Sequence, residues 1–198
     1  SSSEVYGFPK IFPTPESEPL VVPDPTNPRF SYSSSKIMGE ILSINFAKKN
    51  KIDYTIGRFH NVYGPKMGFE HVIPEFIRKI VKKEIFDVQG DGSQTRSFCY
   101  VTDAINEMIL VSENKKGINK IFNLGNDEEI NIKKLIELLQ HISGNEIKPQ
   151  FHPFENAGTD RRVPNLSEIK KLGYEPKISI EEGLKKIFKW YSEYYLCN

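Results

Sequence analysis

The pattern of apolar residues is clearest over residues 32–50, where it has the spacing of a helix. No proline interrupts this stretch. Two adjoining apolar stripes share the spacing: Ile37, Ile41 and Ile44 form one, and Met38, Leu42 and Phe46 form the other. The pattern therefore predicts a helix. Because this helix is apolar on more than one face, we expect it to pack against two layers of structure or against a partner subunit.

Apolar runs of strand length alternate with helical patterns through the rest of the chain. The predicted strands cover residues 54–59, 86–89, 98–101, 120–124 and 147–151. The predicted helices cover about 74–83, 102–114, 130–143, a short segment after Asn165, and 179–195. Thr102 would cap the helix at 102–114. The alternation indicates an α/β fold with a parallel sheet.

Residues 7–29 are rich in proline, which excludes a helix and most strand pairing. The prolines of this region are Pro9, Pro13, Pro15, Pro19, Pro23, Pro25 and Pro28. They predict one long loop. Loops of this length inside a compact domain are usually functional or disordered.

Composition narrows the class of protein. The 198 residues carry 27 Lys and Arg against 26 Asp and Glu, so a net charge of +1 gives no general attraction to nucleic acid or anionic membrane. Two cysteines, Cys99 and Cys197, cannot build a disulfide framework. No apolar run approaches the ~20 residues of a membrane span. We therefore expect a cytoplasmic globular protein with no nucleic-acid or membrane partner, and with enough residues to bury a core.

Tyr32 and Lys36 are the first candidate catalytic residues. At positions i and i+4 they lie on one face of the helix predicted at 32–50. A nearby ammonium group favours the phenolate form of a tyrosine, which can then act as a general base. The pattern alone is weak, because any helix can carry it. The alternative is a structural tyrosine beside a solvated lysine.

Further segments combine polar side chains with glycine. They are Ser-Ser-Ser-Glu-Val-Tyr-Gly at 1–7, Arg-Phe-His-Asn-Val-Tyr-Gly-Pro at 58–65, Gly-Asp-Gly-Ser-Gln-Thr-Arg at 90–96, and Asp-Arg-Arg-Val-Pro-Asn at 160–165, which precedes Leu-Gly-Tyr-Glu-Pro at 172–176. The segment at 58–65 ends a predicted strand and enters a loop, where the sites of α/β proteins collect. The segment at 90–96 is not a dinucleotide fingerprint, because it lacks the third glycine.

Taken in order, these motifs resemble the C-terminal part of an extended short-chain dehydrogenase/reductase of the NAD-dependent nucleotide-sugar epimerase/dehydratase family. The resemblance covers essentially the whole chain. It implies NAD as the cofactor, a nucleotide-diphosphate sugar as the substrate, and a 4-keto sugar intermediate formed when hydride passes from C4 to NAD. Members often form dimers, and the apolar helix at 32–50 would be the homodimer interface.

The resemblance also implies the fold and its division into domains. The chain would hold the rear half of a Rossmann-type, doubly wound parallel sheet and a smaller α/β substrate-binding domain. Residues 1–64 and 101–125 would belong to the NAD-binding domain. Residues 65–100 and 126–198 would form the nucleotide-sugar-binding domain.

Catalytic roles follow from the same resemblance. Tyr32 matches the base that removes a proton from a sugar hydroxyl. Lys36 matches the residue that activates this base and binds the nicotinamide ribose, so both side chains would contact the cofactor. A serine after the preceding strand binds the same hydroxyl. Ser3 or Ser2 fits that role, because the triple serine leaves the register open by one residue.

Glu4 bears on which reaction the family member catalyses. A simple 4-epimerase needs no second acid or base, whereas dehydratases and uronate decarboxylases of the family carry a carboxylate here that can move a proton. The alternative is a Glu4 that only caps a loop. The run at 58–65 is instead close to the form seen in GDP-sugar epimerases. Epimerisation, dehydration and uronate decarboxylation all stay open, as does a non-catalytic fragment that binds sugar nucleotides.

Three neighbouring residues match contacts to the cofactor and the substrate. Asn61 matches the family's asparagine that binds the substrate diphosphate. Phe59 and His60 would pass beside the nicotinamide, although a satisfied buried histidine at the sheet end is an equal alternative for His60. No metal site is predicted, because no second His or Cys lies at ligand spacing from His60.

Two arginines match those that grip the substrate diphosphate. They are Arg96 and Arg162, with Arg161 as the competitor in register. A guanidinium offers a planar fork to phosphate oxygens, which lysine cannot reproduce. A structural salt bridge is the alternative for either. Val72 matches the segment that covers the nucleotide base, and Asn123 is expected to line the ligand cleft.

The glycine-rich phosphate loop of the family is absent from this sequence, and this absence generates a prediction. A Rossmann site needs both of its halves to hold a pyrophosphate at a helix N-terminus. We therefore expect the 198-residue chain alone to show no saturable NAD binding up to about 1 mM in a calorimetric titration, and no turnover. A measurable affinity of this chain for NAD would contradict the prediction.

Overall fold

A computed structural model describes residues 1–153 and 160–197. The chain divides into two compact units. The first contains Ser1–Val62, Ser97–Asp127 and Arg162–Pro176, and the second contains Tyr63–Arg96, Glu128–Arg161 and Lys177–Asn198. This division differs from the expected one chiefly at residues 162–176, which pack with the first unit. That the first unit binds NAD and the second the nucleotide sugar remains a prediction.

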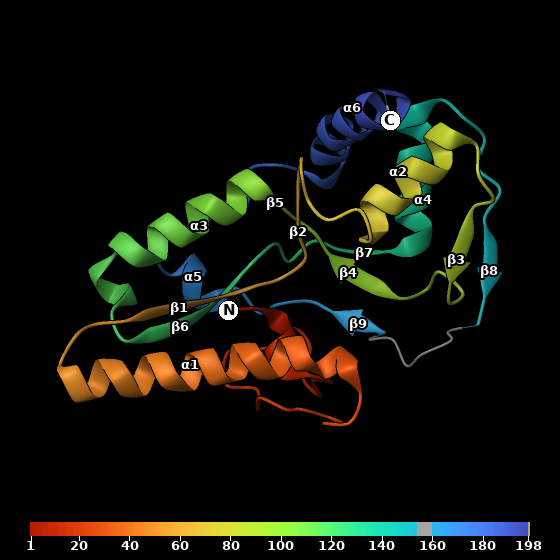
Figure 1. Cartoon of the computed structure of the whole chain (residues 1–198). Helices are drawn as coiled ribbons and strands as arrows, with labels where there is room; N and C mark the ends of the chain where they lie inside the picture. The colour runs from red at the N-terminus through yellow and green to blue at the C-terminus, as the bar shows by residue number, and fades with distance from the viewer. Residues whose placement is uncertain (154–159, 198) are drawn as a thin grey trace. The chain divides into compact units, whose positions relative to one another are not determined.

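The first unit is built on parallel strands. β1 (Thr55–Phe59) pairs in parallel with β6 (Lys120–Leu124), and the chain at Ser2 forms a parallel bridge to Phe59. Figure 1 shows α3 (Val101–Glu113) above this pair and α1 (Ser31–Asn50) below it. α5 (Ser167–Lys170) packs against β6. The short 3-10 helices η1 (Ser3–Tyr6), η2 (Pro28–Phe30) and η3 (Lys115–Gly117) complete the unit.

Helix α1 is the predicted helix at 32–50, but its burial differs from the expectation. The face turned toward the unit carries Ser33, Glu40 and Ala47, spaced seven residues apart. The apolar side chains of the other face are 48–63% exposed: Met38, Ile41, Leu42 and Phe46. The expected packing of the apolar faces against two layers of this chain is therefore wrong for these four side chains. Packing against a partner subunit remains a prediction.

The second unit groups helices with short strands. α2 (Val72–Lys82) packs against α6 (Ile180–Cys197) and α4 (Ile132–Ser143), and α4 also packs against α6. β3 (Asp87–Gln89) pairs in parallel with β8 (Gln150–His152). β4 (Thr95–Ser97) lies between β7 (Glu129–Asn131) and β9 (Arg161–Arg162). β2 (Val62–Tyr63) pairs with β5 (Cys99–Tyr100). The unit boundaries fall within β2, β4 and β9.

The predicted α/β alternation is confirmed, with corrections at element ends. α3 begins at Val101 with Tyr100 at its N-cap and no capping side chain, so the predicted Thr102 cap is wrong. Residues 129–131 form a strand, and the Asn131 side chain caps α4 by accepting from the backbone N–H of Lys134 at 2.7 Å. Of the described residues, none belongs to a helix long and apolar enough to cross a membrane.

The proline-rich segment forms a loop, as predicted, and backbone contacts fix its middle to a distant part of the first unit. Thr14 makes a parallel bridge to Pro164. The backbone N–H of Thr14 donates to the carbonyl of Val163 at 2.8 Å, and the N–H of Asn165 donates to the carbonyl of Thr14 at 2.8 Å. These bonds hold the loop against the segment that follows Arg162.

A buried carboxylate lies beside the core of the first unit. The apolar cluster between α3, β6 and α5 consists of Val111, Phe122, Leu124, Leu166, Ile169 and Tyr174. Glu107 of α3 is wholly buried and accepts a hydrogen bond from the backbone N–H of Gly125 at 2.7 Å. The Cys99 thiol lies 3.8 Å from its other oxygen. Burial raises the pKa of Glu107 to about 8 and also raises the pKa values of Cys99 and Tyr174.

The raised pKa of Glu107 makes stability depend on pH in a defined direction. Between pH 4.5 and about 8 the unfolded carboxyl has lost its proton and the folded one keeps it. Taken alone, Glu107 therefore lowers the free energy of unfolding by about 1.4 kcal/mol per pH unit as pH rises through this window. Burial lowers the pKa of His60 to about 3, so His60 has the opposite effect below pH 6.5, and the net fall should appear between pH 6.5 and about 8. Urea unfolding at several pH values measures the slope.

A matched pair of variants isolates the contribution of Glu107. Glu107→Gln should flatten the fall in the free energy of unfolding between pH 6.5 and about 8, because no carboxyl proton is then released. Glu113→Gln changes an exposed carboxyl on the same helix and should leave the fall unchanged. If Glu107→Gln retained the full slope, another group would be its source.

Candidate functional site

The serine motif follows the bridge to β1 and turns into η1. The Ser2 hydroxyl accepts from the backbone N–H of Glu4 at 3.3 Å and so caps η1. Ser3 is buried at 5% exposure, whereas the Glu4 carboxylate is one-third exposed. The serines thus have different roles: the Ser2 hydroxyl caps the backbone of η1, and Ser3 is buried in the fold.

Tyr32 and Lys36 lie in the first turns of α1, on one face, as their spacing predicts. The Lys36 ammonium lies 5.3 Å from the centre of the Tyr32 ring, a cation–π contact. Tyr32 is 51% exposed and Lys36 is partly exposed. α1 also packs against η1, the helix that carries Ser3 and Glu4. Both members of the pair are therefore accessible to a ligand at this end of the first unit.

A buried ion pair fixes α1 to β1. The Arg58 guanidinium donates from Nε and from a terminal nitrogen to the two oxygens of Glu40, at 2.9 and 2.7 Å. Both side chains are 3% exposed. Burial alone would raise the pKa of Glu40, but hydrogen bonds from Arg58 and Ser1 outweigh it, and the pKa falls below its ordinary value. Neither member of this pair was predicted, although Glu40 is an acidic residue in the middle of an otherwise apolar stretch.

The ion pair extends into a network of uncharged groups. Arg58 also donates to the Tyr6 hydroxyl at 2.9 Å, and that hydroxyl donates to the side-chain oxygen of Asn123 at 2.7 Å. Burial raises the pKa of Tyr6 to about 12, so it remains a donor. Tyr6 is 1% exposed, so its side chain packs inside the first unit.

Asn123 and His60 belong to the same network, which revises their expected roles. The side-chain oxygen of Asn123 accepts from Tyr6 and lies 3.1 Å from His60 Nε2, and its nitrogen donates to the carbonyls of Thr14 and Asn165. All four hydrogen-bonding positions of the amide are used. Asn123 therefore holds the fold together and has no group left for a ligand.

His60 takes the structural alternative of the two roles considered for it. It is 1% exposed, and burial lowers its pKa to about 3. The ring is neutral at neutral pH, and its Nε2–H donates to Asn123. Phe59 is partly buried and, with Val62 and Met108, lines an apolar pocket of about 310 Å³ beside α3. Of the two predicted cofactor contacts on this strand end, Phe59 lines this pocket and His60 is buried; contact of either with the cofactor remains a prediction.

Glu4 meets Arg162 in a two-pronged ion pair. One terminal nitrogen of Arg162 contacts one Glu4 oxygen, and the other nitrogen lies 3.3 Å from the second oxygen. The Arg162 side chain is 11% exposed. The contact between the Thr14 loop and residues 163–165 holds Arg162 at this position. The expected acid/base and an expected anion-binding arginine thus lie side by side.

Arg161 has a different ion-pair partner from Arg162. Its guanidinium donates to both oxygens of Glu129 at 2.8 Å. Glu129 also accepts from the hydroxyl of Thr95. Arg161 therefore has a structural partner on β7, whereas the partner of Arg162 is Glu4, itself a predicted site residue.

Arg96 and Val72 line one pocket of the second unit. The pocket has a volume of about 290 Å³ and is walled by α2, β3 and β4, with Glu70 at its edge. Arg96 donates to the backbone carbonyl of its neighbour Thr95 at 2.7 Å, which orients its side chain. The structure thus brings together the predicted base-covering residue and a predicted phosphate-binding arginine.

Asn61 lies at the end of the first unit's β1 segment in a left-handed backbone conformation, with φ of 40°. Its side-chain nitrogen donates to the carbonyl of Ser97 at 3.0 Å, and its own carbonyl accepts from the N–H of Cys99. The side-chain nitrogen of Asn61 is used in this way. The role of Asn61 in diphosphate binding remains a prediction.

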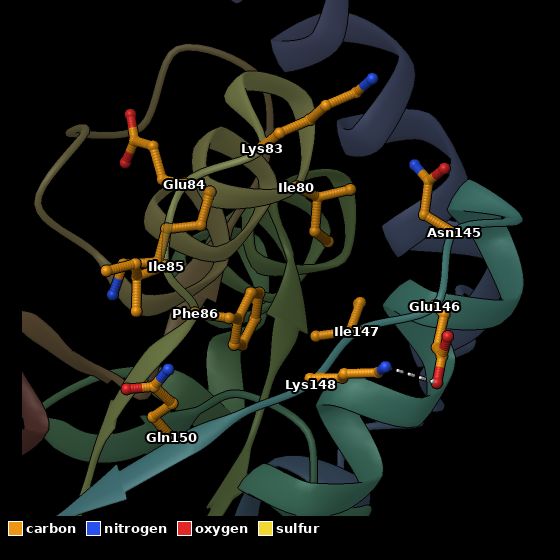
Figure 2. A pocket seen from close by; sticks show the side chains of 11 residues that line it. Ile80, Lys83, Glu84, Ile85, Phe86, Asn145, Glu146, Ile147, Lys148 and Gln150 are labelled. Atoms are coloured by element: carbon orange, nitrogen blue, oxygen red, sulfur yellow. Dashed lines mark ion pairs between the residues drawn. The ribbon is translucent and has the colours of Figure 1, made fainter.

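A second pocket of the second unit contains no predicted site residue. It has a volume of about 390 Å³ and lies between the C-terminal end of α2 and the segment around Ile147 (Figure 2). Phe86 and Ile80 contribute apolar wall, and Lys148 pairs with Glu146. Among the described residues, no group of three or more His, Cys, Asp or Glu side chains could hold a metal ion.

Comparison with known proteins gives consistent results. Residues 1–125 match the model of the NAD dependent epimerase/dehydratase family. UDP-glucuronic acid decarboxylase 3 of Arabidopsis thaliana is 36% identical over 190 residues, which cover 93% of this chain and 54% of the plant protein. The chain spans about half the length of the curated relatives that it matches.

Solved structures agree over nearly the whole chain. UDP-glucose 4-epimerase of Thermotoga maritima, solved with UDP-glucose, has a TM-score of 0.87 at 30% identity, over 98% of this chain and 62% of that one. UDP-glucuronic acid 4-epimerase of Bacillus cereus, solved with UDP-glucuronic acid and NAD, has a TM-score of 0.85 at 29% identity, over 98% and 60%. The predicted fold class, part of a Rossmann-type α/β protein, is thereby confirmed.

Proposed function

The chain belongs to the NAD-dependent epimerase/dehydratase family, and we propose that it supplies the catalytic groups and the nucleotide pocket of an enzyme that decarboxylates a nucleotide-linked glucuronate. The observation that carries this proposal is the pairing of Glu4 with Arg162. An arginine is the side chain best suited to bind a sugar's own carboxylate. The names of the curated relatives, UDP-glucuronic acid decarboxylases, support the same substrate.

The residues present fit the nicotinamide end of NAD. Tyr32 and Lys36 are adjacent, and both are accessible, as holding a nicotinamide ribose requires. Phe59 offers an apolar surface on the neighbouring strand. NAD, when bound, would take the hydride from sugar C4 and later return it. The chain's own residues supply the proton transfers and the binding of charge.

Tyr32 would remove the proton from the C4 hydroxyl. The Lys36 ammonium beside it stabilises the phenolate that this step requires. Ser3 would hydrogen-bond the same hydroxyl and so fix its orientation. Together the three residues would leave a ketone at C4, which prepares the neighbouring carbon for loss of its carboxylate.

Arg162 and Glu4 would act on the 4-keto sugar. Its C6 carboxylate is β to the ketone, so the C5–C6 bond can break and leave its electron pair as an enolate across C5, C4 and O4. The Tyr32 hydroxyl, protonated in the preceding step, faces this enolate oxygen. Arg162, which the resemblance matches to a diphosphate-binding arginine, is here assigned to the sugar carboxylate instead and would bind it until carbon dioxide leaves. Glu4, released from Arg162 by the substrate carboxylate, would then assist the proton transfer to C5.

The second unit would bind the nucleotide. Its pocket of about 290 Å³ presents apolar surface from Val72 and the guanidinium of Arg96, and has an opening to solvent. Arg96 fits a phosphate oxygen, and Val72 fits the face of a base. Asn61, on the first unit, would add an amide to the diphosphate. The nucleotide-diphosphate sugar remains a proposed substrate of this chain.

A 4-epimerase is the second candidate function. The supporting observation is the likeness to the epimerases of T. maritima and B. cereus over 98% of the chain. Tyr32, Lys36 and Ser3 would serve that reaction equally. The two functions differ in the use of Glu4 and Arg162, because an epimerase that acts on a glucuronate must keep the C6 carboxylate.

Product analysis tests the proposed function in the full-length protein that contains this chain. Incubated with NAD and UDP-glucuronic acid, it should release carbon dioxide and give a UDP-pentose by mass spectrometry. Tyr32→Phe should reduce turnover about 100-fold or more, since general-base catalysis typically contributes that much. Tyr54→Phe, a change of the same kind outside the site, should leave turnover intact.

The remaining outcomes distinguish the candidate functions. Glu4→Gln should slow formation of the UDP-pentose, because Glu4 acts after carbon dioxide has left, and should leave UDP binding unchanged. A product of unchanged mass would establish epimerisation in place of decarboxylation. Loss of water from a UDP-hexose would establish dehydration. If Tyr32→Phe turned over at the rate of the unaltered protein, the catalytic assignment would be rejected.

A homodimer through α1 is the proposed assembly. The apolar side chains on the exposed side of this helix fall on neighbouring turns, and Leu42 and Phe46 are 61% and 63% exposed. Contiguous apolar surface of this kind commonly marks a protein–protein interface. A second copy of the same helix presents the same stripe, so a twofold contact would bury both.

Introducing charge on α1 tests the homodimer. Leu42→Glu in the full-length protein should convert a dimer to a monomer in analytical ultracentrifugation, because the carboxylate would be buried at the interface. Ile85→Glu changes an equally exposed isoleucine (64%) in the other unit and should leave the dimer intact. A monomeric unaltered protein, or a Leu42→Glu protein that stays dimeric, would count against this interface.

A further inference from the structure

The segment between β2 and α2 lies at the edge of the proposed nucleotide pocket. Residues 64–71 have no helix or strand, and they contain Gly64 and Gly68. Glu70 lies in this segment and Val72 directly follows it, and both line the pocket of about 290 Å³. Because glycine-containing loops have many accessible conformations, something outside the loop must fix this edge of the pocket.

Helix α6 supplies that support through its tyrosines. Tyr191 is wholly buried, and its hydroxyl donates to the backbone carbonyl of Met67 at 2.5 Å. Tyr195, one turn later, is 6% exposed and donates to the carbonyl of Pro74 in the first turn of α2 at 3.2 Å. Figure 1 shows α6 and α2 side by side, in agreement with their packing. One helix thus holds both the loop and the start of α2.

An aromatic stack adds a second connection between the loop and α6. The Phe69 ring is stacked on Tyr194, with ring centres 4.8 Å apart and planes 29° apart, and meets Tyr191 edge-on at 5.7 Å. Tyr194 is in turn stacked on Trp190 at 5.8 Å. Phe69 nevertheless remains 43% exposed. Its position therefore depends on these ring contacts more than on burial in a core.

We propose that Phe69, Tyr191 and Tyr194, here called the aromatic clamp, are positioning residues that hold Glu70 and Val72 in place for nucleotide binding. The clamp residues touch no part of the proposed substrate. They act through the loop, by removing conformations in which the edge of the pocket is displaced. The proposal rests on the proposed nucleotide role of the pocket, and it adds a C-terminal helix to the parts that determine affinity.

A matched pair of phenylalanine variants tests the clamp. In the full-length protein, Phe69→Ala should raise the dissociation constant for UDP roughly two- to tenfold in calorimetry, the range expected from loss of an aromatic pair. Phe8→Ala removes a phenylalanine of similar exposure (44%) from the proline-rich loop of the first unit and should leave UDP affinity unchanged. Phe69→Tyr retains the ring and should restore affinity.

Kinetic constants separate positioning from general damage to the fold. Phe69→Ala should raise KM for the nucleotide sugar and leave kcat unchanged, because the reacting groups lie outside the clamp. Tyr191→Phe removes only the hydroxyl that holds Met67 and should raise KM in the same sense. If Phe69→Ala fails to fold, the KM of Tyr191→Phe tests the proposal.

The test separates failure of the clamp from failure of the pocket. If the unaltered protein binds UDP and both variants bind it equally well, the clamp is overturned and the nucleotide pocket stands. A fall in kcat with KM unchanged would also overturn it. If the unaltered protein binds no UDP, the proposed nucleotide role is overturned, and the clamp with it.

Discussion

The buried ion pair between Glu40 and Arg58 is the interaction on which the first unit's arrangement depends. Two charges at 3% exposure are stable only where their hydrogen-bonding positions are filled. Here Arg58 fills its remaining positions with the Tyr6 hydroxyl and the carbonyl of Glu16. Because Tyr6 then bonds Asn123, one network joins α1, β1, η1 and β6. Displacing any of these elements would leave a charge or an amide buried without a partner.

This constraint separates the residues that hold the site from those that can act in it. Glu40 and Asn123 are buried and saturated, whereas Tyr32 and Glu4 remain accessible. Preorganised sites need both kinds of residue, because the position of a reacting side chain is set by the residues that pack against it. The proline-rich loop also positions a site residue. Its backbone hydrogen bonds to residues 163–165 hold Arg162 beside Glu4.

The second unit fixes its pocket by different means. No buried charge pair of the Glu40–Arg58 kind holds the loop at 64–71 among the contacts described for that unit. The Tyr191 hydroxyl donates to the carbonyl of Met67, and the Tyr194 ring stacks on Phe69. Such contacts are individually weaker than a buried pair of charges. The loop therefore depends on the sum of several ring contacts, whereas the first unit depends on one network of charged and polar groups.

The sequence by itself determined the main helices, the strands β1 and β6 and the α/β class, because apolar periodicity is a local property. The short strands β2, β4, β7 and β9 were not predicted, because two or three residues are too few to show a period. It also placed Tyr32 and Lys36 on one helical face. Only the tertiary structure decided which polar residues became internal, since Tyr6 and Asn123 are 117 residues apart and Glu4 and Arg162 are 158 apart. Local spacing cannot show such a pairing. For that reason the sequence predicted a ligand contact for Asn123, which is buried in the structure, and predicted no role for Glu40.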